Sequence, residues 1–96
     1  MSSVRSPGPV ADVPRVKPTG QRLVLYVREG CHLCDRFLVD LGIELAGAAE
    51  PLIVDVDNDP GLAARYGLRV PVLEIDGVTA GEGSLDRDRF RALFPL

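Results

Sequence analysis

Residues 23–34 read LVLYVREGCHLC, an apolar run followed by two cysteines separated by His32 and Leu33. The run Leu23–Val27 is short, continuous and partly β-branched, which is typical of a strand buried on both faces. A helical pattern then runs from about Cys31 to Ala46, and its apolar positions are spaced four residues apart. These positions are Leu33, Phe37, Leu41 and Leu45. Two thiols at a strand-to-helix junction indicate a redox pair.

The two cysteines are predicted to have different roles. At a helix start, Cys31 meets unpaired backbone N–H groups and the positive end of the helix dipole, and both favour the thiolate. The thiolate is the nucleophile in disulfide exchange. Cys34 lies one turn deeper on the same face, from which it can attack a mixed disulfide on Cys31 and release the substrate.

Composition limits the class of protein. A chain of 96 residues with 46% apolar content allows one domain with a modest core. Its only two cysteines form the motif, which argues against a small secreted disulfide scaffold and favours a reducing compartment. Neither a membrane-spanning apolar run nor a signal-peptide core is present, so we expect a cytoplasmic protein that does not bind membranes. A formal charge of −3 is not a nucleic-acid-binding profile.

The chain divides into two parts. Residues 1–20 are rich in proline and carry no helical or strand period, which predicts a flexible N-terminal extension. Residues 21–96 are predicted to form the domain. Within it, Leu52–Val56 repeats the buried-strand pattern, so a right-handed crossover should place this strand parallel to the first.

The second half of the domain contains further helix and strand signals. Asn58, Asp59 and Pro60 should start a short helix that ends at Gly67. The segments Val72–Ile75 and Val78–Ala80 are separated by Asp76-Gly77, which predicts a hairpin. Ser84 can cap a last helix. The prediction is an α/β domain of order β-α-β-α-β-β-α, with a four-stranded mixed sheet flanked by helices.

This order, with Cys-x-x-Cys after the first strand and Val70-Pro71 before the third, resembles the glutaredoxin branch of the thioredoxin superfamily. Residues 25–35 and 66–73 are most similar to small glutaredoxin-like proteins with a Cys-His-Leu-Cys site. The resemblance implies a thioredoxin/glutaredoxin fold in which Pro71 is cis and faces the cysteine pair. It also implies that the backbone before Pro71 pairs with substrate like an added strand. Val70 and Pro71 would then form the wall of the substrate site.

The resemblance also bears on glutathione. Arg28 matches a basic position that attracts a glutathione carboxylate and supports the thiolate in glutaredoxins. Glutaredoxins hold the ends of glutathione with a Gly-Gly-x-Asp-like segment, but Glu82 stands here where the second glycine would be. A carboxylate at that position would oppose a glutathione carboxylate. Glutathione is therefore a doubtful reductant for this chain.

Two further positions concern the thiol chemistry. His32 occupies the place of a proline in glutaredoxins, and an imidazolium beside Cys31 would favour the thiolate and make the couple more oxidising. The group that accepts the Cys34 proton is left open between Glu29, His32 and water.

The leading hypothesis is a thiol–disulfide oxidoreductase that uses the Cys31/Cys34 dithiol and needs no metal or bound coenzyme. Its partners would be a disulfide-containing protein or a small-molecule thiol, with a reductase as an alternative electron source. A non-catalytic adaptor or redox sensor that binds a protein partner is the second hypothesis. A metal or cluster carrier is the third, although the chain offers no second cysteine pair. No long exposed apolar stripe requires a dimer, so we expect a monomer.

Overall fold

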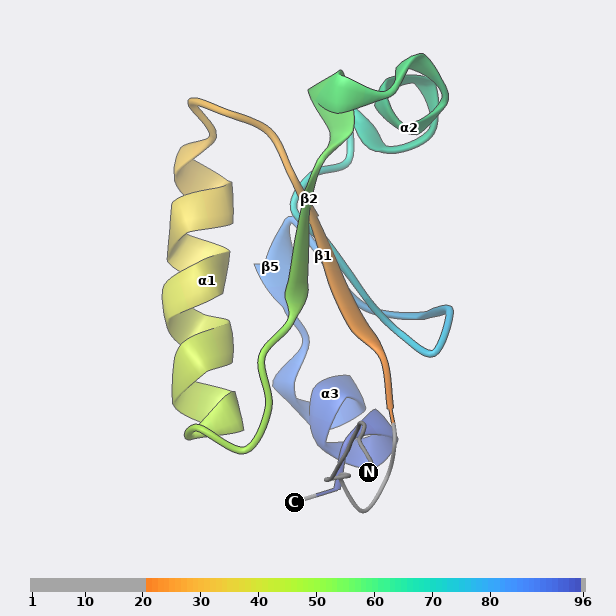
Figure 1. The fold of residues 1–96 in the computed structure, drawn as a ribbon. Coiled ribbons are helices and arrows are strands. Elements are labelled where there is room, and N and C mark those ends of the chain that lie inside the picture. The colour runs from red at the N-terminus through yellow and green to blue at the C-terminus, as the bar shows by residue number, and fades with distance from the viewer. Residues whose placement is uncertain (1–20, 96) are drawn as a thin grey trace, which may run out of the picture.

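The computed structural model describes residues 21–95 and has the predicted α/β order. Figure 1 shows a sheet with α1 along one side and α2 at its upper end. The predicted order β-α-β-α-β-β-α is confirmed, with a short 3-10 helix and a two-residue strand added. The elements are β1 Leu23–Val27, α1 His32–Leu45, β2 Leu52–Asp55, η2 Val56–Asn58, α2 Pro60–Tyr66, β3 Val72–Ile75, β4 Val78–Glu82, β5 Ser84–Leu85 and α3 Arg87–Leu93. The predicted extension, residues 1–20, lies outside the described residues.

The sheet is mixed, as predicted, and its strand order is β2-β1-β3-β4-β5. β1 pairs with β2 in parallel, and every other pairing is antiparallel. The four predicted strands form most of the sheet, and β5 adds a two-residue edge strand beside β4. In the β1–β3 ladder Tyr26 lies opposite Val72. This register places the segment after β1 and the segment before β3 at the same end of the sheet.

α1 presents an apolar stripe to the sheet. Its buried residues are Cys34, Phe37, Leu41 and Leu45. Leu33, predicted to lie on this stripe, is instead 59% exposed, and the first buried position is Cys34. Residues three or four positions before Phe37 both lie near its face of the helix. Here Cys34, three positions before Phe37, faces the core, and Leu33, four positions before it, does not. Cys34 therefore belongs to the core-facing side of the helix.

The main core lies between the sheet and the two helices α1 and α3. It contains Leu23, Leu25, Phe37, Leu41, Leu45, Leu73, Ile75, Ala80, Leu85, Phe90 and Phe94. Gly81 in β4 makes a close approach to this core. A Cβ at Gly81 would lie 2.9 Å from Cζ of Phe37 and 2.8 Å from the Ser84 carbonyl oxygen, so only glycine fits there. The fit brings β4 directly against α1.

The opposite face of the sheet has a smaller cluster under α2. Val56, Tyr66 and Val72 are buried together, and Tyr26, Leu62 and Val70 pack against them. The Tyr26 and Tyr66 rings stack with centroids 4.0 Å apart. Alternate residues of β3 supply the two clusters, because side chains alternate between the faces of a strand. Val72 belongs to this small cluster, whereas Leu73 belongs to the main core.

Two further local predictions were wrong. β2 was expected to be buried on both faces, but Leu52 is 59% and Ile53 44% exposed because the strand lies at the edge of the sheet. Ser84 was expected to cap the last helix, but it lies in β5. The Asp86 carboxylate caps α3 instead, accepting a hydrogen bond from the Arg89 amide at 3.1 Å. Within residues 21–95, none of the helices combines the length and apolar character needed to cross a membrane.

Candidate functional site

The two cysteines form a disulfide at the start of α1. Cys31 is the N-cap, and its Sγ accepts a hydrogen bond from the Cys34 amide at 3.1 Å. Gly30, immediately before it, has φ of +76° and open space around its Cα, so the backbone turn itself is what calls for glycine. The Cα atoms of the two cysteines are 5.2 Å apart. The turn and the N-cap together place the disulfide at the exit of β1.

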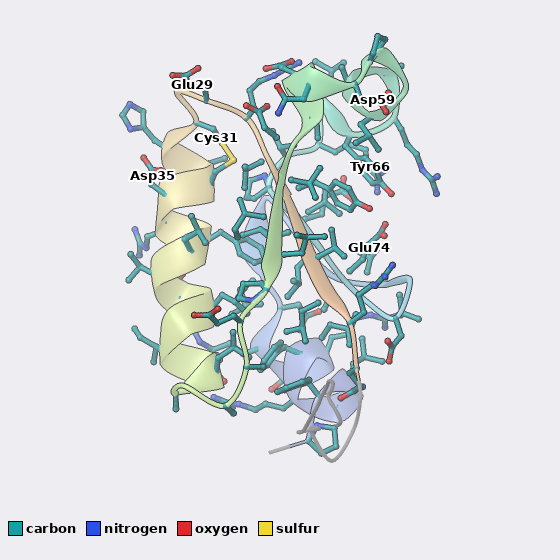
Figure 2. The ribbon with its side chains drawn as sticks, viewed as in Figure 1. Glu29, Cys31, Asp35, Asp59, Tyr66 and Glu74 are labelled. Carbon is teal, nitrogen blue, oxygen red and sulfur yellow. A yellow bond between two sulfur atoms is a disulfide. The ribbon has the colours of Figure 1, made fainter. Side chains whose placement is uncertain are left out.

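The two sulfurs differ in exposure. Cys34 is 3% exposed and belongs to the apolar stripe of α1, whereas Cys31 is half-buried. Figure 2 shows the disulfide at the upper end of α1, directed toward the sheet, with Glu29 on the loop before the helix and Asp35 on its outer side. An incoming disulfide can therefore reach Cys31 more easily than Cys34. His32, the first residue of α1, is exposed.

The predicted substrate wall lies at the same end of the sheet. The Val70–Pro71 peptide bond is cis, Pro71 is buried and Val70 is half-buried. The Val70 amide donates to the Tyr66 carbonyl at 3.0 Å, and the Pro71 carbonyl accepts from the Gly83 amide at 2.8 Å. The segment is thus held by the end of α2 on one side and by the β4–β5 turn on the other. Its pairing with a substrate strand stays a prediction.

Arg28 forms an intramolecular clamp at the surface, where its side chain is 36% exposed and that of Asp57 48% exposed. Its guanidinium contacts the Asp57 carboxylate through Nε at 3.0 Å and Nη2 at 2.9 Å, and Nη1 donates to the Gly67 carbonyl at 3.0 Å. The hydrogen bond to Arg28 lowers the pKa of Asp57, and the same bond raises the pKa of Arg28. The clamp joins the residues before Cys31 to η2 and to the end of α2. Arg28 therefore has protein partners at the position from which it was expected to attract a ligand carboxylate.

Gly67 is part of the clamp through its backbone. A Cβ there would lie 3.0 Å from Nη2 of Arg28 and 2.4 Å from the Ala63 carbonyl oxygen. The sequence analysis assigned Gly67 only to the end of a helix and did not single out Asp57 as a site residue. Arg28 and Asp57 are 29 positions apart, and no local pattern signals an ion pair over that separation.

A second ion pair lies beside the wall. Arg69 Nη2 contacts Oε1 of Glu82 at 3.0 Å. The hydrogen bond to Arg69 lowers the pKa of Glu82 and raises that of Arg69. The Glu82 charge, expected to oppose a ligand carboxylate, thus has a cation of the protein against it. Sequence reasoning missed Arg69, although the residue directly precedes Val70.

Residues 81–86, which the sequence resemblance matched to a glutathione-binding segment, form a tight β4–β5 hairpin at their start. In the chain, β5 separates Glu82 from α3. At the start of α3 the Arg89 amide already donates a hydrogen bond to the Asp86 carboxylate. An open pocket of about 450 Å³ borders this hairpin. It is lined by Thr79, Gly81, Glu82, Ser84, Asp86 and Arg89. Neither cysteine nor Pro71 lines it, so we do not place the thiol chemistry there.

Tyr66, at the end of α2, contacts three charged side chains. The Tyr66 hydroxyl donates to Oε2 of Glu74 at 2.9 Å, and the guanidinium carbons of Arg65 and Arg69 lie 5.2 and 5.5 Å from the Tyr66 ring centroid. Burial, followed by the hydrogen bond to Glu74, raises the pKa of Tyr66 to about 12. Among residues 21–95, no three His, Cys, Asp or Glu side chains gather in an arrangement that could hold a metal ion.

Comparison with known proteins identifies a family and sequence relatives that cover most of the described residues. Residues 22–94 match the family described as "Glutaredoxin-like domain (DUF836)". Uncharacterized proteins of Mycobacterium tuberculosis and Mycobacterium bovis are each 36% identical over 76 residues, covering 71% of this chain and 76% of the relative.

Two solved structures are also similar. Protein Ne2328 from Nitrosomonas europaea has a TM-score of 0.69 and 31% identity, covering 83% of this chain and 95% of that one. Protein XcR50 from X. campestris has a TM-score of 0.58 and 37% identity, covering 73% of this chain and 91% of that one. The family match spans β1 to α3, the whole of the sheet and its helices. With the Cys31–Cys34 pair at the exit of β1, this match shows that the chain belongs to the glutaredoxin-like family.

Proposed function

We propose that this protein is a thiol–disulfide oxidoreductase that exchanges the Cys31/Cys34 dithiol with substrate disulfides. The observation that carries the proposal is the asymmetry of the pair: Cys31 is a half-buried N-cap, and Cys34 is a buried residue within disulfide reach of it. A thiolate at Cys31 gains the N–H groups and dipole of the helix start, which lowers the cost of its charge.

The reaction balances without a metal or a bound coenzyme. The Cys31 thiolate attacks one substrate sulfur, the substrate S–S bond breaks, and the departing thiolate takes up a proton. The Cys34 thiol loses its proton and attacks Sγ of Cys31, which releases the second substrate thiol and forms the Cys31–Cys34 disulfide. Two electrons pass to the substrate. A low-molecular-weight thiol or a reductase would return the protein to its dithiol form.

In this proposal the mixed disulfide lies against Val70 and Pro71, and the substrate is a disulfide-containing protein or a small disulfide. The register of β1 and β3 supports this placement, because it sets Pro71 at the end of the sheet where β1 leads to Cys31. We also propose that the protein works as a monomer in the cytoplasm. Thiol pools there keep exposed cysteine pairs reduced and ready to react.

The roles of the cysteines are tested by exchanging each for serine. Cys34→Ser should accumulate a covalent mixed disulfide with a model disulfide substrate, since the attacking sulfur remains and the resolving one is gone. Cys31→Ser should form none, because Cys34 is buried. Mass spectrometry of the protein after acid quenching and alkylation measures both. A trapped adduct on Cys31→Ser and none on Cys34→Ser would overturn the assignment.

An equilibrium titration of the pair in graded dithiol buffers tests the proposal as a whole. We expect a reversible two-electron couple within about −270 to −120 mV, the span of known exchange proteins. A pair that never closes, or that stays closed under strong reductant, would rule out turnover. Binding of a protein partner by the Cys31→Ser/Cys34→Ser variant would then favour the adaptor hypothesis.

A further inference from the structure

Two guanidinium groups lie near the proposed reaction site, and both are held by carboxylates of the protein. Arg28 is bound by Asp57 through a two-pronged contact and by the Gly67 carbonyl. Arg69 is bound by Glu82 at 3.0 Å. Arginine forks are well suited to bind the carboxylates of a ligand. In this structure the protein itself supplies the carboxylates.

Both ion pairs belong to the end of the sheet that carries the cysteines. Arg28 follows the last residue of β1 and precedes Cys31 by three positions. Arg69 precedes Pro71 by two positions, and Glu82 lies opposite Val72 in the β3–β4 ladder. The next residue of the turn, Gly83, donates to the Pro71 carbonyl. The two pairs therefore border the Cys31 side and the Pro71 side of the same site.

Two further carboxylates lie around the start of α1. In Figure 2 the Glu29 carboxylate lies at the top of the loop before α1, and the Asp35 carboxylate lies on the outer side of the helix, while the disulfide is directed toward the sheet. Ion pairing lowers the pKa of both Asp57 and Glu82, so both stay ionised at neutral pH and the pairs persist there. To bind Arg28 or Arg69, a substrate carboxylate must then displace the carboxylate of the protein that already holds it. A neutral or cationic substrate does not compete for these arginines.

We propose that Asp57 and Glu82 are specificity-determining residues: by holding Arg28 and Arg69 in intramolecular ion pairs, they direct the cysteine pair toward neutral and cationic disulfides and away from disulfides that carry carboxylates. The inference rests on the proposed function and narrows its substrate class. The chemical step is the one already balanced, in which one substrate disulfide is reduced to two thiols as Cys31 and Cys34 are oxidised.

The test compares three small disulfides that differ in charge: dithiodipropionate, which is dianionic, hydroxyethyl disulfide, which is neutral, and cystamine, which is dicationic. Fully reduced protein is mixed with each, and samples are acid-quenched, alkylated and weighed to give the rate of Cys31–Cys34 oxidation. Each rate is divided by that for 2-mercaptoethanol with the same disulfide, which removes differences in intrinsic reactivity. The wild-type protein should react about tenfold more slowly with the anionic than with the neutral disulfide, a gap that shrinks near 1 M salt.

Glu82→Gln and Asp57→Asn should each raise the anionic-to-neutral rate ratio by about threefold or more, the effect of one unit charge at a partly screened site. In Asp57→Asn the Gly67 carbonyl still holds Arg28 in place. Glu50→Gln is the matched control, because it makes the same change in net charge at the start of β2, the opposite end of the sheet. Its ratio should equal that of the wild type.

The outcomes separate the two proposals. Equal normalised rates for all three disulfides, or ratios that rise no more in Glu82→Gln and Asp57→Asn than in Glu50→Gln, would overturn the specificity inference and leave the oxidoreductase proposal standing. Rates no faster than those of 2-mercaptoethanol with every disulfide would overturn the proposed function itself. A rise confined to Glu82→Gln would remove Asp57 from the inference and keep Glu82.

Discussion

The two faces of the sheet are held together by different means. Under α1 and α3, a continuous apolar cluster that includes Phe37 and Phe90 fills the space. Under α2, only Val56, Tyr66 and Val72 are buried together, and Tyr66 is anchored by a hydrogen bond to Glu74. Hydrophobic stabilisation grows with the apolar area buried, so the first face holds most of the folding free energy. The second face carries the end of α2 and the segment before Pro71. Substitutions on this face should therefore affect the candidate site more than the free energy of unfolding.

Phe37→Ala should have the largest effect on stability, because Phe37 is 1% exposed and lies at the centre of the large cluster. Truncating a buried phenylalanine costs about 3–5 kcal/mol, a large part of the roughly 5–15 kcal/mol that holds a small domain together. Urea unfolding at neutral pH measures the loss. The control is Ile43→Ala, on the same helix but 65% exposed, which should change stability by about 0.5 kcal/mol or less. A loss below about 1 kcal/mol for Phe37→Ala would contradict the first half of the comparison.

Tyr66→Phe tests the other face and should cost about 1 kcal/mol, the net value of a typical hydrogen bond. It should also change the response to alkaline pH. The pKa of Tyr66 is raised from 10.0 to about 12 in the folded protein, so the folded state keeps the proton after the unfolded chain has lost it. That contribution is complete below pH 10 and is lost as the pH rises from 10 through about 12.

Urea unfolding at neutral pH and at several alkaline values measures this slope. The wild type should lose more stability than Tyr66→Phe above pH 10. Glu74→Gln keeps an oxygen that can accept from the Tyr66 hydroxyl, so its loss at neutral pH should be the smaller of the two. Equal alkaline slopes in the wild type and in Tyr66→Phe would show that Tyr66 does not link the second face to pH.

The contrast between the faces also explains which features could be predicted from the sequence. Element order and the α1 stripe follow from local periodicity, and the hairpin follows from Asp76-Gly77, because each signal lies within a few residues. The exposure of β2 could not be predicted from local periodicity. An apolar run such as Leu52–Val56 has the same sequence pattern in an edge strand and in a central strand, and only the strand order decides which it is.

For the site, the sequence predicted residues but not their partners. Cys31, Cys34 and the Val70–Pro71 segment were predicted from a motif and a resemblance, and the structure brings the two segments to one end of the sheet. Arg28 was expected to attract ligand, yet its partner Asp57 lies across the fold. Such an ion pair depends on how distant elements pack together. The sequence alone could therefore not predict which charges of the site are paired.

Glu44→Gln should have the smallest effect and sharpens the claim that burial, not ion pairing, holds the first face. Glu44 on α1 accepts hydrogen bonds from Nε of Arg87 at 3.1 Å and Nε of Arg91 at 3.0 Å, both on α3. The hydrogen bond to Arg91 lowers the pKa of Glu44 below its ordinary 4.5. The Glu44 side chain is 11% exposed, but those of Arg87 and Arg91 are 44% and 62% exposed. Water and salt therefore screen these ion pairs from the arginine side, and we expect them to contribute little.

A lowered folded pKa fixes the sign of the pH dependence. The contribution of Glu44 is present above pH 4.5 and is lost as the pH falls through the folded value, because the unfolded chain takes up the proton first. Thermal unfolding from pH 7 to pH 3 should therefore show the wild type slightly more stable than Glu44→Gln at neutral pH, with the two converging in acid. Glu50→Gln, the same change outside α1, should match the wild type at neutral pH. A loss as large as that of Phe37→Ala would mean that ion pairs between α1 and α3 hold the first face as strongly as the apolar cluster does.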